Sequence, residues 1–125
     1  MLFDSDVMIW YLRGNKNAVS YIEDSHQISI SAITYMEVIR GLKNKERLYQ
    51  WKSLIADLNI KVISIDEKIS SKAMFWIEQF TLSHGLELTD ALIAATADTY
   101  ELPLFSGNTK DYKFLPGLTI KTFRE

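Results

Sequence analysis

The sequence contains no cysteine, which excludes disulfide bonds, thiolate metal sites and a cysteine nucleophile. Its two histidines, His26 and His84, are too few for the usual zinc or copper sites. No apolar run is long enough to span a bilayer, and no basic segment followed by an apolar one marks a secretion signal. We therefore expect a cytoplasmic protein that does not contact membranes.

An excess of basic residues is also absent. The chain has 14 Lys and Arg against 16 Asp and Glu, for a formal net charge of -2. Any polyanion must therefore be bound by local basic patches rather than by an overall positive field. With two prolines, five glycines and 47% hydrophobic residues in 125 positions, we find no linker and expect a single domain over 1–125.

Segments rich in apolar and β-branched residues alternate with segments of helical period. The pattern predicts strands at 1–3, 27–32, 60–65, 102–105 and 118–123, and helices at 7–12, 15–24, 34–44, 46–58, 66–83 and 88–100. Gly85 is expected to end the helix that precedes it. Strands that alternate with helices predict an α/β fold, with a mostly parallel sheet covered on both faces.

Acidic residues follow several of these strands or begin the helices after them. They are Asp4, Glu37, Asp90 and Asp111. Functional groups in an open α/β sheet gather beyond the carboxyl ends of the strands, so we expect these acids to share a site. Clustered carboxylates repel one another, and a divalent cation with oxygen ligands is the usual remedy.

Each acid also has a purely structural interpretation. Thr34 and Glu37 have the spacing of a capping box, and Asp90 after Thr89 lies where a carboxylate interacts favourably with the helix dipole. Asp6 is a candidate N-cap for the first helix, which leaves Asp4 without a capping role.

The last acidic segment also has a structural interpretation. Asn108 can cap a short turn with Asp111 in its first residues, and for Asp111 we favour that interpretation over direct metal binding.

Two segments of the chain resemble the conserved motifs of PIN-domain nucleases. Residues 2–9 (LFDSDVMI) are similar to the opening motif of that family, and residues 87–97 (ELTDALIAATA) to its central motif. Residues 30–38 (ISAITYMEV) and 102–108 (LPLFSGN) fit the remaining parts, so the resemblance covers the whole chain. Length and motifs are most similar to the VapC-type toxins of toxin–antitoxin pairs.

The resemblance implies a three-layer α/β/α sandwich of the PIN type. It further implies an endoribonuclease that depends on Mg²⁺ or Mn²⁺, cleaves single-stranded RNA and inhibits translation as the toxin of a type II pair. Asp4, Glu37 and Asp90 match the catalytic and metal-binding acids of the family. The fourth acidic position falls on Asn108, so Asp111 is an alternative source of that charge. Supporting positions around the site are Ser5, Asp6, Thr34, Ser106, Asn108 and Asp111.

Partners also follow from the resemblance. It implies a small VapB-like antitoxin that binds DNA, so that this chain meets DNA only indirectly, and it implies a homodimer. The substrate would be single-stranded RNA or tRNA. Basic residues near the acids are candidate RNA contacts, although a solvated helix face explains such charges equally well: Arg13, Arg40, Lys43 and Lys110.

Two other functions fit parts of the sequence. Asp4 and Asp6 have the spacing of the nucleophile and the acid/base of haloacid-dehalogenase-type phosphatases, but Val7 and Met8 replace the Gly-Thr that usually follows. A non-catalytic protein-binding module of the same fold is the second alternative. The retention of several repelling acids argues against it.

Overall fold

The computed structural model describes residues 1–125 and contains five strands, six α-helices and a short 3-10 turn. The strands are β1 (Leu2–Phe3), β2 (Ser29–Ser31), β3 (Lys61–Ile63), β4 (Leu104–Ser106) and β5 (Ile120–Thr122). The helices are α1 (Ser5–Leu12), α2 (Lys16–Glu23), α3 (Ala32–Arg40), α4 (Lys45–Asp57), α5 (Glu67–His84) and α6 (Leu88–Thr99), with the turn η1 (Thr109–Asp111). Every predicted strand and helix is present, with ends that differ by a few residues.

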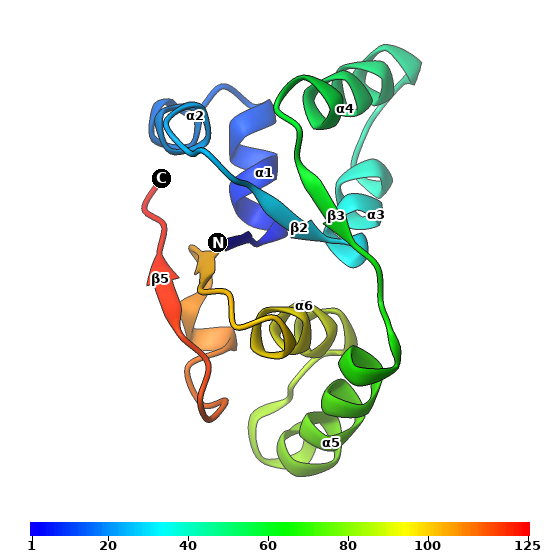
Figure 1. The fold of residues 1–125 in the computed structure, drawn as a ribbon, viewed down its shortest axis with the longest axis vertical. Coiled ribbons are helices and arrows are strands. Elements are labelled where there is room, and N and C mark those ends of the chain that lie inside the picture. Colours follow the sequence, from blue (N-terminus) through cyan, green and yellow to red (C-terminus); the bar gives the residue numbers. More distant parts are fainter.

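All five strands belong to one sheet, in the order β3-β2-β1-β4-β5, and every neighbouring pair is parallel. Leu2 pairs with Ser29 on one side and with Leu104 on the other. The chain reaches β4 only after crossing the sheet from β3, so the strand order reverses at β1 (Figure 1). Crevices for ligands form at such reversal points, beyond the carboxyl ends of the strands. Here that point lies between β1 and β4.

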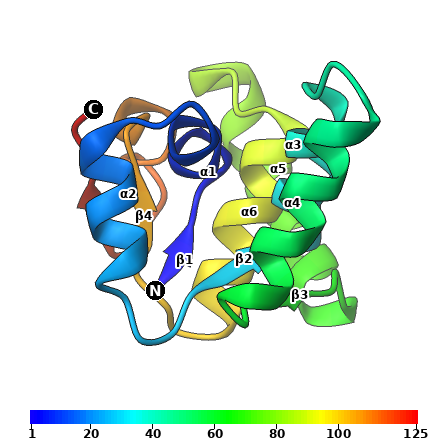
Figure 2. The same cartoon turned by 90° about the horizontal axis from the view of Figure 1, so that it is seen from above.

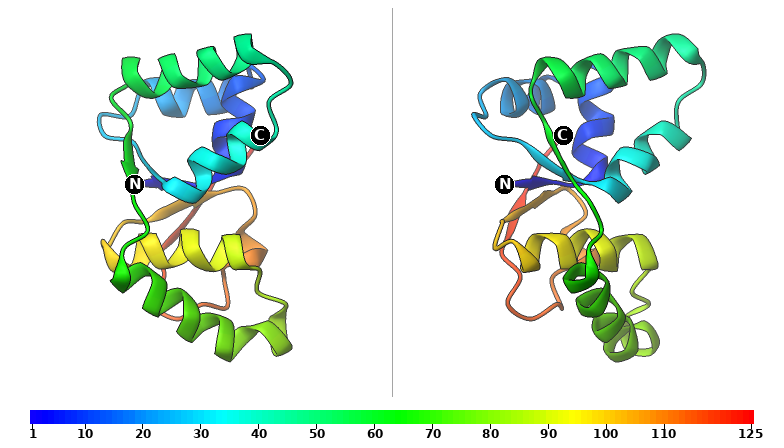
Figure 3. Two further views of the ribbon diagram at one scale, coloured as in Figure 1. Left: turned by 90° about the vertical axis from the view of Figure 1, so that its right-hand side faces the viewer. Right: turned by 45° about the vertical axis from the view of Figure 1, so that its right-hand side comes forward.

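The sheet separates two layers of helices. Helices α1 to α4 cover one face, whereas α5 and α6 cover the other (Figures 1 and 3). Each face has its own apolar core, with Trp51 fully buried in the first and Trp76 in the second. The predicted three-layer α/β/α sandwich is therefore confirmed. None of the helices combines the length and the apolar character needed to cross a membrane.

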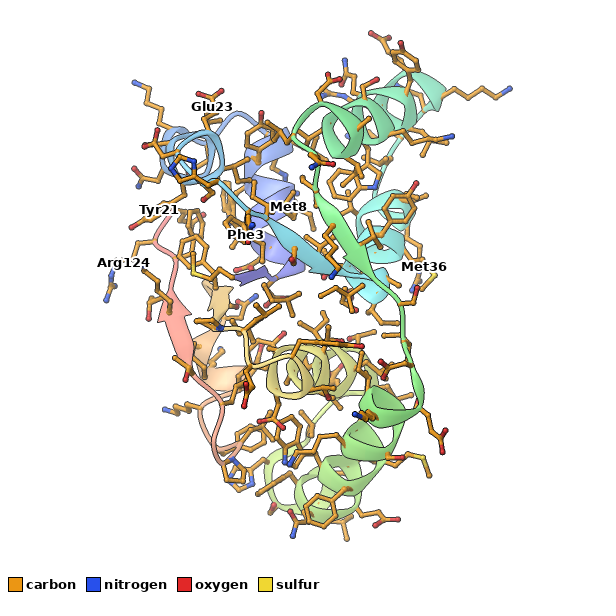
Figure 4. The ribbon with its side chains drawn as sticks, in the orientation of Figure 1. Phe3, Met8, Tyr21, Glu23, Met36 and Arg124 are labelled. Carbon is orange, nitrogen blue, oxygen red and sulfur yellow. The ribbon has the colours of Figure 1, made fainter.

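The central strand β1 has two residues, both fully buried, and it ends where Asp4 becomes the N-cap of α1. Figure 2 shows that β1 runs directly into α1, so the residue between them is held at the carboxyl edge of the sheet. Phe3 and Met8 lie inside the layer formed by the sheet and α1, whereas Met36 is on the outer side of α3 (Figure 4). The apolar burial of β1 thus fixes the position of the residue that follows it, Asp4.

Capping residues set the ends of the longest helix, α5. The Asp66 side chain accepts a hydrogen bond from Ile69 N at 2.9 Å, which begins the helix. Gly85 ends it in the left-handed conformation, with φ of 65°. The predicted glycine cap is confirmed, because only glycine adopts this backbone conformation without steric cost.

Substitution of Gly85 by alanine should destabilise the protein by about 1 kcal/mol, because an L-residue is strained in the left-handed region. No atom lies within 4 Å of the added Cβ, so the effect is one of backbone conformation alone. Gly41→Ala is the matched control, since Gly41 ends α3 with φ of -88° and its Cβ would meet only Val38 O at 3.6 Å. Urea unfolding measures both variants. Equal stability changes in the two would contradict this account.

Candidate active site

Asp4 lies at the carboxyl end of β1 and is 4% exposed. Its Oδ1 accepts a hydrogen bond from Ser5 N at 2.8 Å, and its Oδ2 accepts from Ser106 Oγ at 2.7 Å and Tyr112 Oη at 3.0 Å. Burial raises the pKa of this carboxyl, the three hydrogen bonds oppose the rise, and the charge of Glu37 adds to it. Asp4 therefore joins β1, α1, β4 and the turn that follows β4.

Asp4 also caps helix α1, so the prediction that Asp6 caps this helix and leaves Asp4 without such a role was wrong. The helix begins two residues earlier than expected, at Ser5, because Asp4 directly follows the strand and its side chain accepts a hydrogen bond from the first N–H group of the helix. The capping role does not account for Oδ2, which two other segments of the chain approach.

Asp6 instead links α1 to the loop after β4. Its Oδ2 accepts a hydrogen bond from Gly107 N at 2.8 Å, and its Oδ1 accepts from Val7 N at 2.8 Å. Burial and then the charge of Asp4 raise the pKa of Asp6 to about 6. A Cβ on Gly107 would lie 2.7 Å from Asp6 Oδ2, so this close contact requires glycine.

Helix α3 brings Glu37 toward Asp4. The predicted capping box of Thr34 and Glu37 was wrong, because α3 begins at Ala32 and its N-cap is Ser31, whose Oγ accepts from Ile33 N at 3.0 Å. Thr34 is fully buried within the helix, and its position excludes a capping role. The structural interpretation of Glu37 therefore fails.

The side chain of Ser5 connects α1 to α3 at this point. Its hydroxyl donates to Glu37 Oε1 at 2.6 Å and lies 3.1 Å from Thr34 Oγ1. Because the backbone N–H of Ser5 also bonds Asp4, this one residue contacts two of the predicted acids. Ser5 and Thr34 thus lie beside the acids, as the sequence predicted.

Asp90 lies in the first turn of α6, on the other side of Asp4. The N-cap of α6 is Glu87, which makes no side-chain capping bond, so Thr89 is not a cap. Burial is the largest cause that raises the pKa of Asp90 to about 6, followed by the charges of Asp4, Asp111 and Glu37. The charges of Asp4, Asp111 and Glu37 therefore act on Asp90, although α6 and α3 belong to opposite helix layers.

The end of β4 and the loop after it contribute three more of the predicted positions. Ser106 is fully buried and also accepts a hydrogen bond from Asn108 N at 2.9 Å. Asn108 makes no side-chain capping bond to η1 and is exposed, so its predicted capping role is not observed. Asp111 at the end of η1 is one of the three residues whose charges raise the pKa of Asp90.

Tyr112 is the site residue that sequence reasoning missed. It is 1% exposed, and its hydroxyl lies 3.0 Å from Asp4 Oδ2 and 3.3 Å from Asp90 Oδ1. Burial and the two neighbouring carboxylates raise the pKa of this phenol far above its usual value, so it remains a hydrogen-bond donor. Its only signal in the sequence is its place directly after Asp111.

The donors at this site are suited to a hard divalent cation. Carboxylates and hydroxyls provide only oxygen, which Mg²⁺ and Mn²⁺ prefer. The one salt bridge of the protein, Lys72 Nζ to Asp98 Oδ2 at 3.6 Å, involves none of these acids. Their mutual repulsion is thus not compensated by any basic side chain. No three or more His, Asp or Glu side chains are arranged to hold a metal ion between them.

The predicted RNA contacts are all exposed but do not form one cluster. Arg13 and Lys43 line a groove of about 340 Å³ between α1 and the end of α3, together with Arg47. Arg40 is at the end of α3, and Lys110 is in η1 next to Asp111. No hydrogen bond or ion pair joins any of these five to the acids.

The raised pKa values of Asp6 and Asp90 predict how stability depends on pH in EDTA. Both are about 6 in the folded protein and about 3.9 in the unfolded chain. The folded state therefore binds more protons between these values, so the free energy of unfolding should fall as pH rises from about 4 to about 6. Asp90→Asn should flatten this fall and add on the order of 1 kcal/mol at pH 7, after allowance for solvent screening.

Urea unfolding at a series of pH values tests this prediction. Asp57→Asn controls for the loss of one negative charge. Asp57 is exposed at the end of α4, before the outermost strand β3, whereas the site lies at the carboxyl ends of β1 and β4. A free energy of unfolding that rises with pH over this window in the wild type would show that the carboxylates do not repel.

Known proteins match the chain at the level of family and fold. The PIN domain family model matches residues 1–114, whereas no curated protein matches the sequence. A toxin-antitoxin complex from Klebsiella pneumoniae is 31% identical with a TM-score of 0.76, covering 97% of this chain and 95% of that chain.

Two further solved structures share the fold at lower identity. The DNA-bound VapBC of Salmonella typhimurium has a TM-score of 0.83 and 20% identity, covering 97% of this chain and 96% of the other. VapBC-1 of nontypeable Haemophilus influenzae has a TM-score of 0.79 and 21% identity, with the same two coverages of 97% and 96%. The family match extends from β1 through the turn that carries Asp111 and Tyr112, and so includes every acid of the site. The chain belongs to the PIN-domain family.

Proposed function

We propose that this protein is a metal-dependent endoribonuclease that cleaves single-stranded RNA and acts in the cytoplasm as the toxin of a type II toxin–antitoxin pair, where it inhibits translation. The observation that carries the proposal is the uncompensated cluster of Asp4, Glu37 and Asp90 at the strand-order reversal of a PIN fold. Capping explains neither Glu37 nor Asp4 Oδ2. The identity of 31% to a toxin-antitoxin complex supports the toxin role.

Asp4, Glu37 and Asp90 are the residues that would hold Mg²⁺ or Mn²⁺. When bound, the cation would offset charge on the phosphodiester and promote attack by water. Among the two candidates for a fourth position, we favour Asp111 over Asn108, because the charge of Asp111 reaches Asp90. The carboxylates would have to move closer together on binding, because they do not form a metal-binding group in this structure.

The chain's own residues prepare the acids for this role. Ser106 donates to Asp4 Oδ2 at 2.7 Å and Ser5 donates to Glu37 Oε1 at 2.6 Å, so each carboxylate has a fixed orientation. Hydrogen bonds of this kind raise metal affinity, and their loss typically costs about 10- to 100-fold. The hydroxyl positions predicted from the sequence thus orient the acids.

A polar cavity at the loop after β4, which Asp6 lines, is the proposed path of the RNA strand. It has a volume of about 520 Å³ and is lined by Asp6, Trp10, Asn108, Thr109 and Arg124, among others. Arg124 can meet a phosphate there, and the indole of Trp10 offers a face for a base, since stacking on aromatic rings is common in single-strand binding. Lys110 is in the turn η1, directly after Thr109, which lines this cavity. The haloacid-dehalogenase alternative is disfavoured, because the PIN domain family model matches residues 1–114, which include both Asp4 and Asp6.

Cleavage of a labelled single-stranded RNA tests the nuclease. With Mn²⁺, the wild type should cut, and Asp90→Asn and Glu37→Gln should each lose at least about 100-fold in rate, since each substitution removes a charge that the cation needs. EDTA should abolish cleavage by the wild type. Asp57→Asn should retain the wild-type rate. Cleavage that persists in EDTA and in both site variants would rule out the metal nuclease, and binding without cleavage would favour the non-catalytic module.

The groove between α1 and α3 is the proposed site for a small VapB-like antitoxin. Its floor is apolar, from Ile9, Leu12, Val38 and Leu42, and its rim is basic, from Arg13, Lys43 and Arg47. This combination suits an amphipathic segment with acidic flanks. A partner there would also cover two of the predicted RNA contacts, Arg13 and Lys43. We expect DNA binding only through that antitoxin, and a homodimer of this chain.

Leu42→Glu should prevent neutralisation by the antitoxin, because it places a charge on the apolar floor of the groove. The protein encoded by the adjacent upstream reading frame is co-expressed, and host growth and RNA cleavage are measured. Leu82→Glu is the matched control, since Leu82 is fully exposed on α5 in the opposite helix layer. We expect toxicity only with Leu42→Glu. Neutralisation of both variants would place the antitoxin elsewhere.

A further inference from the structure

Tyr112 contacts two of the acids from a fixed position. Its backbone N–H bonds Thr109 O at 3.1 Å, and its carbonyl accepts from Leu115 N at 2.9 Å, so the turn around it is closed. Its ring belongs to the apolar core under α6, together with Ala91 and Ala94. A buried aromatic ring cannot move without disrupting this packing. The hydroxyl at its end therefore has a well-defined place between the acids.

The hydroxyl of Tyr112 is the only side-chain group that hydrogen-bonds both Asp4 and Asp90. Asp4 Oδ2 and Asp90 Oδ1 can be no further apart than the sum of their distances of 3.0 Å and 3.3 Å to this oxygen. A phenol has one proton, which lies between the two acceptors and reduces their repulsion. Without it, the two carboxylates would turn away from each other or draw in water.

The contact also determines which oxygens remain available. Asp4 Oδ2 accepts from both Ser106 and Tyr112, whereas Asp4 Oδ1 accepts only from Ser5 N. Asp90 Oδ2 has no hydrogen-bond partner. Asp4 Oδ1, Asp90 Oδ1 and Asp90 Oδ2 thus accept at most one hydrogen bond each, so lone pairs remain on these three oxygens after Tyr112 has oriented the two carboxylates.

We propose that Tyr112 is a positioning residue of the metal site, whose hydroxyl keeps Asp4 and Asp90 beside each other before the cation binds, so that only a short movement of the acids completes the site. This inference rests on the proposed function, since it assigns a role toward the same site. Ser5 provides the corresponding link between Asp4 and Glu37. Together the two residues form a continuous chain of contacts from Glu37 through Asp4 to Asp90.

Tyr112→Phe tests the role, because it removes only the hydroxyl and keeps the ring in the core. Melting temperature is measured against Mn²⁺ concentration, which gives an apparent Kd without any substrate, since a ligand that binds the folded state stabilises it. We expect the apparent Kd to rise about tenfold or more, within the range for residues that orient metal ligands. The Mn²⁺ concentration for half-maximal RNA cleavage should rise by the same factor, and excess Mn²⁺ should restore the rate.

Tyr100→Phe is the matched control. The hydroxyl of Tyr100 also donates to an aspartate, Asp66 Oδ2, but at the exposed start of α5. This variant should keep the wild-type Kd. An unchanged Kd in Tyr112→Phe, or a lower cleavage rate that Mn²⁺ does not restore, would overturn the positioning role while the nuclease stands. A wild type that neither cleaves RNA nor responds to Mn²⁺ would instead overturn the proposed function and this inference with it.

Discussion

The hydrogen bonding of one buried carboxylate, that of Asp4, sets the arrangement of the site. An ionised group that is 4% exposed is costly unless donors surround it. Asp4 has three, from Ser5, Ser106 and Tyr112, and they come from α1, the end of β4 and the turn beyond it. Each donor fixes its own segment relative to β1. The same contacts that make the burial of Asp4 tolerable therefore also assemble the crevice at the strand-order reversal.

The negative charges around Asp4 repel one another and so destabilise the folded protein. This repulsion indicates what the site can bind. Asp6 and Asp90 both have pKa values raised to about 6, in each case by burial first and by Asp4 next. No basic side chain relieves the repulsion, since the single salt bridge lies between α5 and α6. A fold selected for stability alone would place a lysine or an apolar residue here. Residues that repel in the absence of a cation are those that a cation would stabilise, which is how sites for divalent metals differ from ordinary ion-pair networks.

The sequence predicted the order and type of the elements because both depend on local patterns. Strand and helix periods, the αL glycine at Gly85 and the alternation of elements all act over a few residues, and they led to a mostly parallel sheet covered on both faces. Helix starts were less well predicted. Ser31 and Thr34 both carry hydroxyls suited to capping, and propensity does not separate them. The choice depends on where β2 stops pairing with β3, at Ser31 opposite Ile63, which is a long-range property. The choice between Asp4 and Asp6 as the N-cap of α1 likewise depends on where β1 ends.

The gathering of acids beyond the carboxyl ends of the strands was predictable, because strand order brings the residues after parallel strands together. Their catalytic and metal-binding roles stay a prediction. The side chains that orient these acids were only partly predictable from the sequence. Ser5 adjoins Asp4, Thr34 lies three residues before Glu37, and Ser106 lies two residues before Asn108, the position of the family's fourth acid. Closeness along the chain to the expected acidic positions identified all three. Tyr112 is 22 residues from Asp90 and 108 from Asp4, and its hydroxyl reaches them only because its ring is anchored in the core beneath α6. A large apolar residue after a turn ordinarily predicts packing, and Tyr112 does pack. Its contact with the two acids depends on how far the hydroxyl extends beyond the apolar core that holds the ring. That distance is set by the folded structure and cannot be inferred from the sequence.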